Sequence, residues 1–264
     1  MIGILDSGIG GLAVARMISD FLDGYDIIFF GDTLRGPYSN KSNIMVETYA
    51  LQAVRFLLGK GARLIVVPCH DISSCATRSI AEKYPVDLID AVNPSVNEAL
   101  KVSRFSRIGV IGTRTTIESG IYEKKIKESR LSAKVYSNPC PLLLPIVEEG
   151  WFKKPETHMI VKKYIHPLKV RQIDTLIAAC SYYFFLHDIL ERKTGKQINV
   201  VNSSLILANH IINFLKSNSN LDRKLSRKNR THFYVTELTP HIRDTAKKFF
   251  KKNLYLEQVK ISTC

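Results

Sequence analysis

The sequence has no leader-like start and no apolar run long enough to span a membrane. Its first six residues enter an apolar stretch directly, without a basic segment or a small-residue cleavage site, so we expect no signal peptide. No apolar run approaches the roughly 20 residues that a spanning helix needs. These features argue against a membrane protein and predict a cytoplasmic one.

Cysteine is scarce, and its spacing matches no common disulfide or metal motif. The five cysteines are Cys69, Cys75, Cys140, Cys180 and Cys264. An odd number at wide spacing, without a CxxC pair or a His/Cys cluster, argues against a disulfide framework and against zinc. We therefore expect reduced thiols and no bound metal. For Cys75, Cys140 and Cys264 we expect the ordinary role of a small apolar side chain.

Acidic residues are few compared with basic ones, 24 against 38, which gives a formal net charge of +14. The excess is greatest in residues 216–230 and in a predicted helix at 239–250. Such an excess indicates either a solvated basic face or a site for a polyanion. Because no zinc finger, RNA-binding signature or basic zipper accompanies it, we expect no nucleic-acid partner.

Short apolar segments alternate with helical segments along most of the 264 residues. The predicted strands are 2–5, 26–30, 64–68, 86–89, 108–113, 175–179, 199–201, 232–236 and 259–261. Strands that alternate with helices predict an α/β fold, in which mostly parallel sheets are flanked by helices.

The pattern at residues 108–113 repeats that of residues 2–7, and each half then has a strand that ends in a cysteine. The two strands start 106 residues apart and the two cysteines lie 111 residues apart. This spacing predicts two pseudo-symmetric lobes with the active site in the cleft between them. We assign residues 1–93 plus 205–264 to the first lobe and 94–204 to the second. Chance similarity of two strand–turn–helix units is the alternative.

The strand-end cysteines, Cys69 and Cys180, suggest a chemistry. Ligands of open α/β sheets bind at the carboxyl ends of the strands. One thiolate and one thiol on opposite faces of a carbon acid can invert it without a cofactor. Both cysteines precede predicted helices, and a helix start lowers the pKa of a thiol, so we expect partial thiolate character.

A second interpretation starts from the glycines after the first strand. Gly8, Gly10 and Ala13 fit the dinucleotide fingerprint G-x-G-x-x-A, and Asp32 lies about 20 residues further on. Asp6 would, however, place a negative charge beside the pyrophosphate. We favour the interpretation that these glycines let the carboxylate of a smaller ligand approach backbone amides.

Several motifs follow one another in a characteristic order. They are Ile4–Gly11, Phe30–Thr33, Pro37–Tyr38, Val66–Cys69, Ile111–Thr113 with Thr116–Ile117, Cys140–Leu142, Pro145–Gly150 and Cys180. With these motifs the chain resembles the cofactor-independent glutamate racemases of the aspartate/glutamate racemase superfamily over essentially its whole length.

This resemblance implies the roles of several residues. Cys69 and Cys180 would be the two acid–base thiols, Asp6 would assist Cys69, and Ser7 would contact the amino group of an amino-acid substrate. Enzymes of this kind use no metal and no pyridoxal phosphate, and they usually work as dimers.

The resemblance also implies a site for the distal carboxylate of the substrate. Backbone groups of Tyr38 and Ser39, which follow Pro37, would bind this carboxylate together with Thr116.

The chain departs from the family pattern beside both cysteines. The pattern has Asn-Thr after the first and Thr-His after the second, whereas this chain has His70-Asp71 and Ser181-Tyr182. Ser39 stands where glycine is usual.

These departures fall at substrate-binding positions. The Asp71 carboxylate would repel the α-carboxylate of the substrate unless His70 is protonated or the substrate differs, and we hypothesise that His70 and Asp71 form a charged pair. Tyr182, with an ordinary pKa near 10, is a poorer proton-transfer partner than histidine.

Three functions therefore stay open. The chain is a glutamate racemase with compensated substitutions, a related racemase or isomerase with a different substrate, or a homologue that has lost racemisation and serves in binding or regulation.

Overall fold

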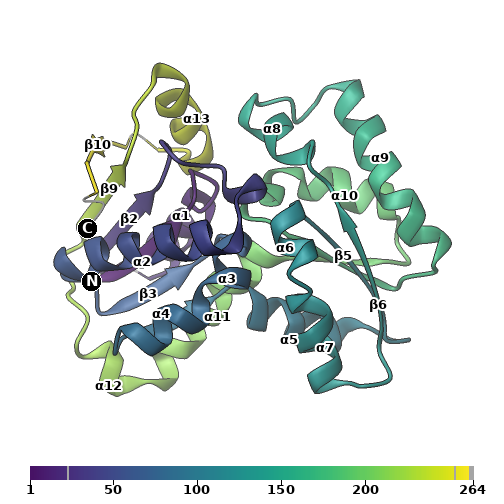
Figure 1. The fold of residues 1–264 in the computed structure, drawn as a ribbon, viewed down its shortest axis with the longest axis horizontal. Helices are drawn as coiled ribbons and strands as arrows, with labels where there is room; N and C mark the ends of the chain where they lie inside the picture. Colours follow the sequence, from purple (N-terminus) through teal and green to yellow (C-terminus); the bar gives the residue numbers. More distant parts are fainter. Residues whose placement is uncertain (23, 253, 262–264) are drawn as a thin grey trace.

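The computed structural model describes residues 1–261 except 23 and 253, and it contains two β-sheets side by side (Figure 1). The first sheet has the strand order β10-β9-β2-β1-β3-β4 and the second has β6-β5-β7-β8, with parallel pairing throughout. The strands are β1 (Ile2–Asp6), β2 (Ile27–Gly31), β3 (Leu64–Val67), β4 (Asp87–Asp90), β5 (Arg107–Gly112), β6 (Lys134–Pro139), β7 (Thr175–Ala179), β8 (Asn199–Asn202), β9 (Thr231–Val235) and β10 (Leu256–Gln258).

Helices flank both sheets, which confirms the predicted two-lobed α/β fold. The α-helices are α1 (Leu12–Phe21), α2 (Asn43–Gly59), α3 (His70–Cys75), α4 (Thr77–Lys83), α5 (Val92–Val102), α6 (Arg114–Glu118), α7 (Ile121–Ser129), α8 (Leu143–Glu148), α9 (Pro155–Val170), α10 (His187–Thr194), α11 (Ser203–Ser217), α12 (Ser219–Asp222) and α13 (Pro240–Phe250). Two 3₁₀-helices, η1 (Tyr38–Asn40) and η2 (Ser181–Leu186), lie between them. No described helix is both long and apolar enough to cross a membrane.

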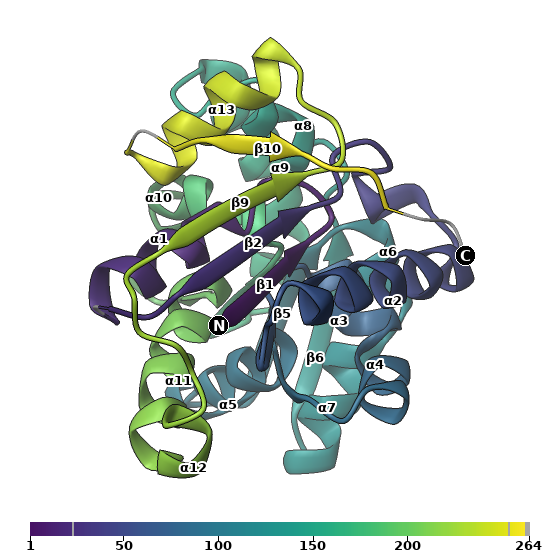
Figure 2. The ribbon, with the colours of Figure 1, turned by 90° about the vertical axis from the view of Figure 1, so that its left-hand side faces the viewer.

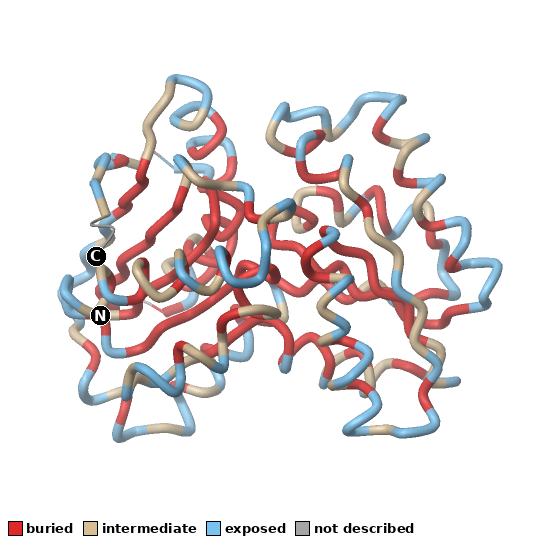
Figure 3. Tube along the Cα trace, viewed as in Figure 1, coloured by how far each residue is buried: buried red, intermediate tan, exposed pale blue. Residues whose placement is uncertain are grey.

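The central strands are buried along their whole length. Every residue of β1, β2, β3 and β7 is buried, and these strands form the core of each lobe (Figure 3). A parallel strand that is covered by helices on both faces needs apolar residues on both faces. The continuous apolar runs in the sequence therefore mark these strands more clearly than any alternation would.

The two lobes share one strand order. In the first sheet β2-β1-β3-β4 are neighbours, and in the second β6-β5-β7-β8 are neighbours in the same order. The equivalence of β3 and β7 places Cys69 and Cys180 at corresponding strand ends. The sheets thus have the pseudo-symmetry that the sequence repeat predicts.

After the second lobe the chain returns to the first sheet. Strand β9 pairs with β2, and β10 pairs with β9 at the edge of the sheet (Figure 2). Helix α11 packs against α1 of the first lobe and against β7 and β8 of the second. The lobe limits at residues 94 and 205 stay a prediction.

Several elements differ from the sequence prediction. Strand β6 was not expected, because its residues are polar and half-exposed at a sheet edge and form no apolar run. The final strand is residues 256–258 rather than 259–261. The single helix expected after Cys69 is divided at Ala76 into α3 and α4.

Part of the basic excess is used inside the fold. Arg230 forms an ion pair of 2.9 Å with the buried Asp26, and Arg227 forms one of 2.6 Å with Asp222. These ion pairs hold the segment before β9 in place. They favour a structural role for its basic residues over a polyanion site. Cys264 lies outside the described residues.

Candidate active site

Two buried thiols lie at equivalent ends of the two sheets. Cys69 follows β3 after Pro68, and Cys180 follows β7 directly; they are 4% and 5% exposed. A hydrogen bond of 3.1 Å from Ser181 Oγ to Asp6 Oδ2 links the carboxyl ends of the central strands β1 and β7. Ser7, which follows Asp6, accepts a hydrogen bond from Cys69, and Ser181 follows Cys180, so these contacts draw the two cysteines toward one interface. The structure brings together the two cysteines that the sequence analysis selected.

Asp6 lies at the end of β1 between the lobes. Its side chain is fully buried, and it accepts hydrogen bonds from the Gly8 N–H (2.9 Å) and from Ser181 Oγ (3.1 Å). Burial raises the pKa of Asp6 to about 6, although these hydrogen bonds to the charged form oppose the rise. Asp6 is therefore a carboxyl group that can exchange a proton near neutral pH.

The environment of the thiols contradicts the expected thiolate character. Burial raises the pKa of both cysteines well above the ordinary value. The next cause is the charge of Asp6 for Cys69 and that of Asp71 for Cys180. The prediction failed because α3 has six residues and Cys180 precedes the 3₁₀-helix η2, while burial and two carboxylates dominate. Cys69 Sγ donates a hydrogen bond to Ser7 Oγ at 3.2 Å.

His70 and Asp71 do not form the hypothesised charged pair. The His70 ring lies between Ser203 Oγ, 3.0 Å from Nε2, and the Tyr122 hydroxyl, 2.7 Å from Nδ1. Burial lowers the pKa of His70 to about 3, so the ring is neutral. Because Ser203 Oγ donates its proton to the Ala178 carbonyl, Nε2–H is the donor to Ser203.

Asp71 instead reaches across to the second lobe. Its Oδ1 accepts hydrogen bonds from the hydroxyls of Thr113 and of Thr116, the latter at 2.8 Å. Burial raises the pKa of Asp71, and these hydrogen bonds oppose the rise. Thr116, expected to bind substrate, is therefore already engaged by a protein carboxylate.

The Tyr182 side chain, from η2, packs against the glycine-rich turn that follows β1. Its hydroxyl accepts a hydrogen bond from the Ile9 N–H at 3.1 Å and donates one to Glu148 Oε1 at 3.1 Å. Burial and the charge of Glu148 raise the pKa of Tyr182 well above its ordinary value. Gly8 and Gly10 leave room for this side chain, so the turn accommodates tyrosine where the dinucleotide alternative requires pyrophosphate.

The segment from Pro37 to Ser39 lies between the lobes. The Tyr38 carbonyl accepts a hydrogen bond of 3.3 Å from Thr115 Oγ1, and the Tyr38 hydroxyl donates to Asp32. Asp32 also accepts from Arg35 Nε and Thr236 Oγ1, so its carboxylate is used within the first lobe. In a dinucleotide-binding site this carboxylate would accept a hydrogen bond from a ribose hydroxyl. Because Asp32 is already bonded within the protein, it does not suit that role.

Two pockets open beside these residues. One of about 330 Å³ is lined by Ser7, Gly8, Tyr182 and Glu148, together with Glu237 and His241 from the last part of the chain. A smaller one of about 90 Å³ is lined by Pro37, Ser39, Thr113 and Glu148 among others. Neither Cys69 nor Cys180 lines these pockets, which border the site through Ser7 and Tyr182 in the first and through Ser39 and Thr113 in the second.

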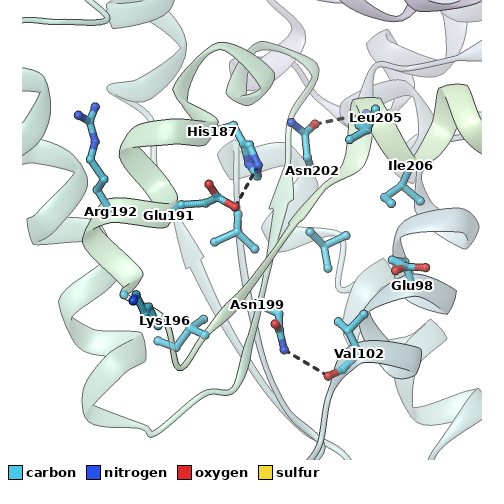
Figure 4. Close-up of a pocket in the computed structure, with 14 residues that line it drawn as sticks. Glu98, Val102, His187, Glu191, Arg192, Lys196, Asn199, Asn202, Leu205 and Ile206 are labelled. Carbon is cyan, nitrogen blue, oxygen red and sulfur yellow. Dashed lines mark hydrogen bonds and ion pairs between the residues drawn. The ribbon is translucent and has the colours of Figure 1, made fainter.

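A separate pocket of about 740 Å³ lies along β8 between α10 and α5 (Figure 4). His187 Nε2 is 3.4 Å from Glu191 Oε1, and Asn199 Nδ2 donates to the Val102 carbonyl at 3.3 Å. Neither Cys69 nor Cys180 lines this pocket, so it is distinct from the candidate active site. In the part of the chain that the structure describes, His, Cys, Asp and Glu form no group of three that could hold a metal ion.

Sequence reasoning assigned no role to two residues that the structure places in the site. Glu148 hydrogen bonds to Tyr182, and Thr113 hydrogen bonds to Asp71. The paired carboxylates Glu148 and Glu149 in a proline-rich segment were a signal for the first. Thr113 had the weaker signal of following a strand that repeats β1.

The contact between Gly8 and Tyr182 makes a testable prediction. A Cβ at Gly8 would lie 2.5 Å from the Tyr182 hydroxyl oxygen but 3.6 Å from the next ring atom. We expect Gly8→Ala to lower the free energy of unfolding by about 1–3 kcal/mol, as overpacking usually does. In a Tyr182→Phe background the loss should be smaller, because the clashing atom is gone. Urea unfolding of the four proteins in this double-mutant cycle measures the coupling, and equal losses in both backgrounds would disprove it.

Comparison with known proteins shows what the chain is similar to. The family described as Asp/Glu/Hydantoin racemase matches residues 13–211. The chain is 35% identical over 261 residues to the glutamate racemase of Persephonella marina, covering 99% of this chain and 97% of that protein. It is 34% identical over 237 residues to the glutamate racemase of Geobacter metallireducens, covering 90% and 87%.

Solved structures are similar over nearly the whole chain. The glutamate racemase of Francisella tularensis, solved with D-glutamate, superposes with a TM-score of 0.90 at 29% identity, covering 98% of this chain and 97% of that one. The glutamate racemase of Aquifex pyrophilus has a TM-score of 0.80 at 33% identity and covers 97% of each chain.

Proposed function

The chain belongs to the Asp/Glu/hydantoin racemase family, and from that premise we propose that it interconverts L- and D-glutamate without a cofactor. The observation that carries the proposal is the pair of buried thiols, Cys69 and Cys180, at equivalent strand ends of two lobes that are linked there by the Ser181–Asp6 hydrogen bond. One cysteine, as the thiolate, removes the Cα proton and becomes a thiol, while the thiol of the other protonates Cα on the opposite face and becomes the thiolate; the two exchange roles in the reverse direction.

The neighbouring groups support this proton transfer. The thiols are protonated in the ligand-free site, because burial and the carboxyl groups raise the pKa of both. A substrate α-ammonium placed between the lobes would offset these negative charges and favour the thiolate that starts the reaction. We propose that Asp6, whose pKa is about 6, relays the proton, and that Ser7 and Ser181, which hydrogen bond to Cys69 and Asp6 respectively, bind polar groups of the substrate.

The distal carboxylate of glutamate is proposed to bind near Tyr38, Ser39 and Thr116, at the small pocket between the lobes. Pro37 and Ser39 line this pocket. His70, Asp71 and Tyr182 complete the surroundings of the thiols, with Tyr182 in the place of the family's histidine.

One observation favours a second candidate. Asp71 places a carboxylate in hydrogen-bond contact with Thr116, which suits a related racemase whose substrate has a different side chain. A homologue that binds an amino acid without racemising it is the third possibility, and retention of both thiols at equivalent positions argues against it.

We further propose that the D-glutamate serves peptidoglycan precursors, that the protein works in the cytoplasm, and that it forms a homodimer. We propose no nucleic-acid partner, since ion pairs use part of the basic excess within the fold.

Solvent exchange tests the proposed function. The protein should incorporate deuterium from heavy water at Cα of L- and D-glutamate, with mass spectrometry and circular dichroism following exchange and inversion. A panel of aspartate, glutamine and basic amino acids serves as comparison. Exchange with another amino acid but not with glutamate would select the second candidate, and exchange with none would select the third.

A further inference from the structure

Two hydroxyl donors of the second lobe converge on one carboxylate of the first. The hydroxyls of Thr113 and Thr116 both donate to Asp71 Oδ1, and the Thr116 N–H donates to Thr113 Oγ1 at 3.2 Å, which holds the two threonines together. Asp71, Thr113 and Thr116 are 4%, 3% and 1% exposed. Converging hydroxyl donors of this kind bind carboxylates well. They form a carboxylate cradle, and Asp71 fills it.

The charge of Asp71 is held without a cation. Among the described residues, the hydrogen-bond partners of its carboxylate are the hydroxyls of Thr113 and Thr116. The adjacent His70 is turned away toward Tyr122 and Ser203. A second carboxylate that enters this cradle therefore meets a like charge with no counterion to offset it.

The cradle lies beside the reacting groups and beside open space. The charge of Asp71 raises the pKa of both Cys69 and Cys180, so it lies within electrostatic range of the two sulfurs. Thr113 also lines the pocket of about 90 Å³ that includes Ser39. A ligand held between the thiols can extend toward this cradle.

We propose that Asp71 is a built-in occupant of the subsite for the side-chain carboxylate of the substrate, and that it thereby sets substrate specificity. The proposal rests on the racemase function proposed above. An amino acid with a second carboxylate must displace Asp71 from Thr113 and Thr116. One with a neutral side chain need not, so Asp71 disfavours glutamate relative to its neutral isostere, glutamine.

Two substitutions separate charge from occupancy. Asp71→Asn removes the charge but keeps an oxygen that accepts from the threonines, whereas Asp71→Thr removes both. We expect Asp71→Thr to shift the ratio of glutamate affinity to glutamine affinity at least 10-fold toward glutamate, by a lower dissociation constant and KM with a smaller change in kcat. The shift for Asp71→Asn should lie between that of Asp71→Thr and no change.

Titration calorimetry with L-glutamate and L-glutamine measures the affinities, and deuterium exchange measures turnover. The matched control is Asp174→Asn. Asp174 is also a buried aspartate, but it precedes β7 at the end opposite Cys180 and accepts from Ser103 Oγ at 2.6 Å. The control should keep the parent ratio, and thermal unfolding checks that each variant folds.

An unchanged affinity ratio in the folded Asp71 variants would overturn the inference, even if the protein racemises glutamate. Absence of exchange in every protein would remove the proposed function, whereas a shifted binding ratio would still support the role of Asp71. The two failures are therefore distinguishable.

Discussion

Replacing either Cys69 or Cys180 by alanine is expected to lower racemisation of glutamate by about 10³-fold or more, since positioned acid–base groups contribute about 10²–10⁴-fold. Inversion needs proton removal on one face of Cα and protonation on the other. Either variant keeps one thiol and so loses one of these two proton transfers. We therefore expect similar losses from the two substitutions, although the residues come from different lobes.

The double variant makes this expectation sharper. If the thiols act as one unit, Cys69→Ala with Cys180→Ala should cost little more than either change alone. Initial rates from both enantiomers, followed by circular dichroism, measure each loss. Additive losses would contradict a shared proton-transfer step.

The control for these variants is Cys75→Ala. Cys75 lies on α3, is partly exposed, and donates a hydrogen bond of 3.3 Å to Asn43 Oδ1. This change removes a thiol near the site without touching the paired ones, so the rate should stay near that of the parent. Thermal unfolding of all variants separates lost chemistry from lost structure.

The fold could be predicted from the sequence because its central strands are apolar on both faces. The apolar runs that form β3 and β7 stand out in the sequence, and the repeated strand–turn–helix pattern predicts the shared strand order. The edge strand β6 could not be predicted in this way. Its polar, half-exposed residues give no signal until β5 is present to pair with them.

The site could be predicted in its members but not in its electrostatics. Strand-end position identified both cysteines, and the family resemblance identified Asp6. Their protonation depends on burial, which the sequence does not show. The helix-start rule predicted lowered thiol pKa values, whereas burial and the carboxylates raise them.

The residues beside Cys69 show the same limit. Adjacent His70 and Asp71 suggest a charged pair, because sequence neighbours are the only partners that can be seen in advance. In the fold, His70 bonds to Tyr122 and Ser203, and Asp71 bonds to Thr113 and Thr116. All four partners lie 42 to 133 residues further along the chain, at distances where no local sequence rule applies.

His70 should make the stability of the protein depend strongly on pH. Its pKa falls from 6.5 in the unfolded chain to about 3 in the fold because of burial. Below pH 6.5 the unfolded chain binds a proton that the folded protein does not, so stability falls as the pH falls. The loss from this group reaches about 5 kcal/mol near pH 3, of which about 3 kcal/mol is lost by pH 4.

Asp6 acts in the opposite direction. Its pKa rises from 3.8 to about 6 on folding, so between these values the folded protein binds the extra proton. Stability from this group therefore increases as the pH falls from 6 to 3.8, by about 3 kcal/mol. The two groups partly cancel in the parent, which is why a variant is needed to see either one.

We expect His70→Asn to lose less stability than the parent between pH 7 and pH 4, by about 3 kcal/mol. Asparagine has no titrating group, yet it can donate to Ser203 and accept from Tyr122 as the ring does. Urea unfolding at pH 7, 5.5 and 4 measures the difference. His166→Asn, at an exposed position on α9, is the control and should follow the parent. If His70→Asn also follows the parent, His70 is not held neutral by the fold, and the assignment of its two hydrogen-bond partners fails with it.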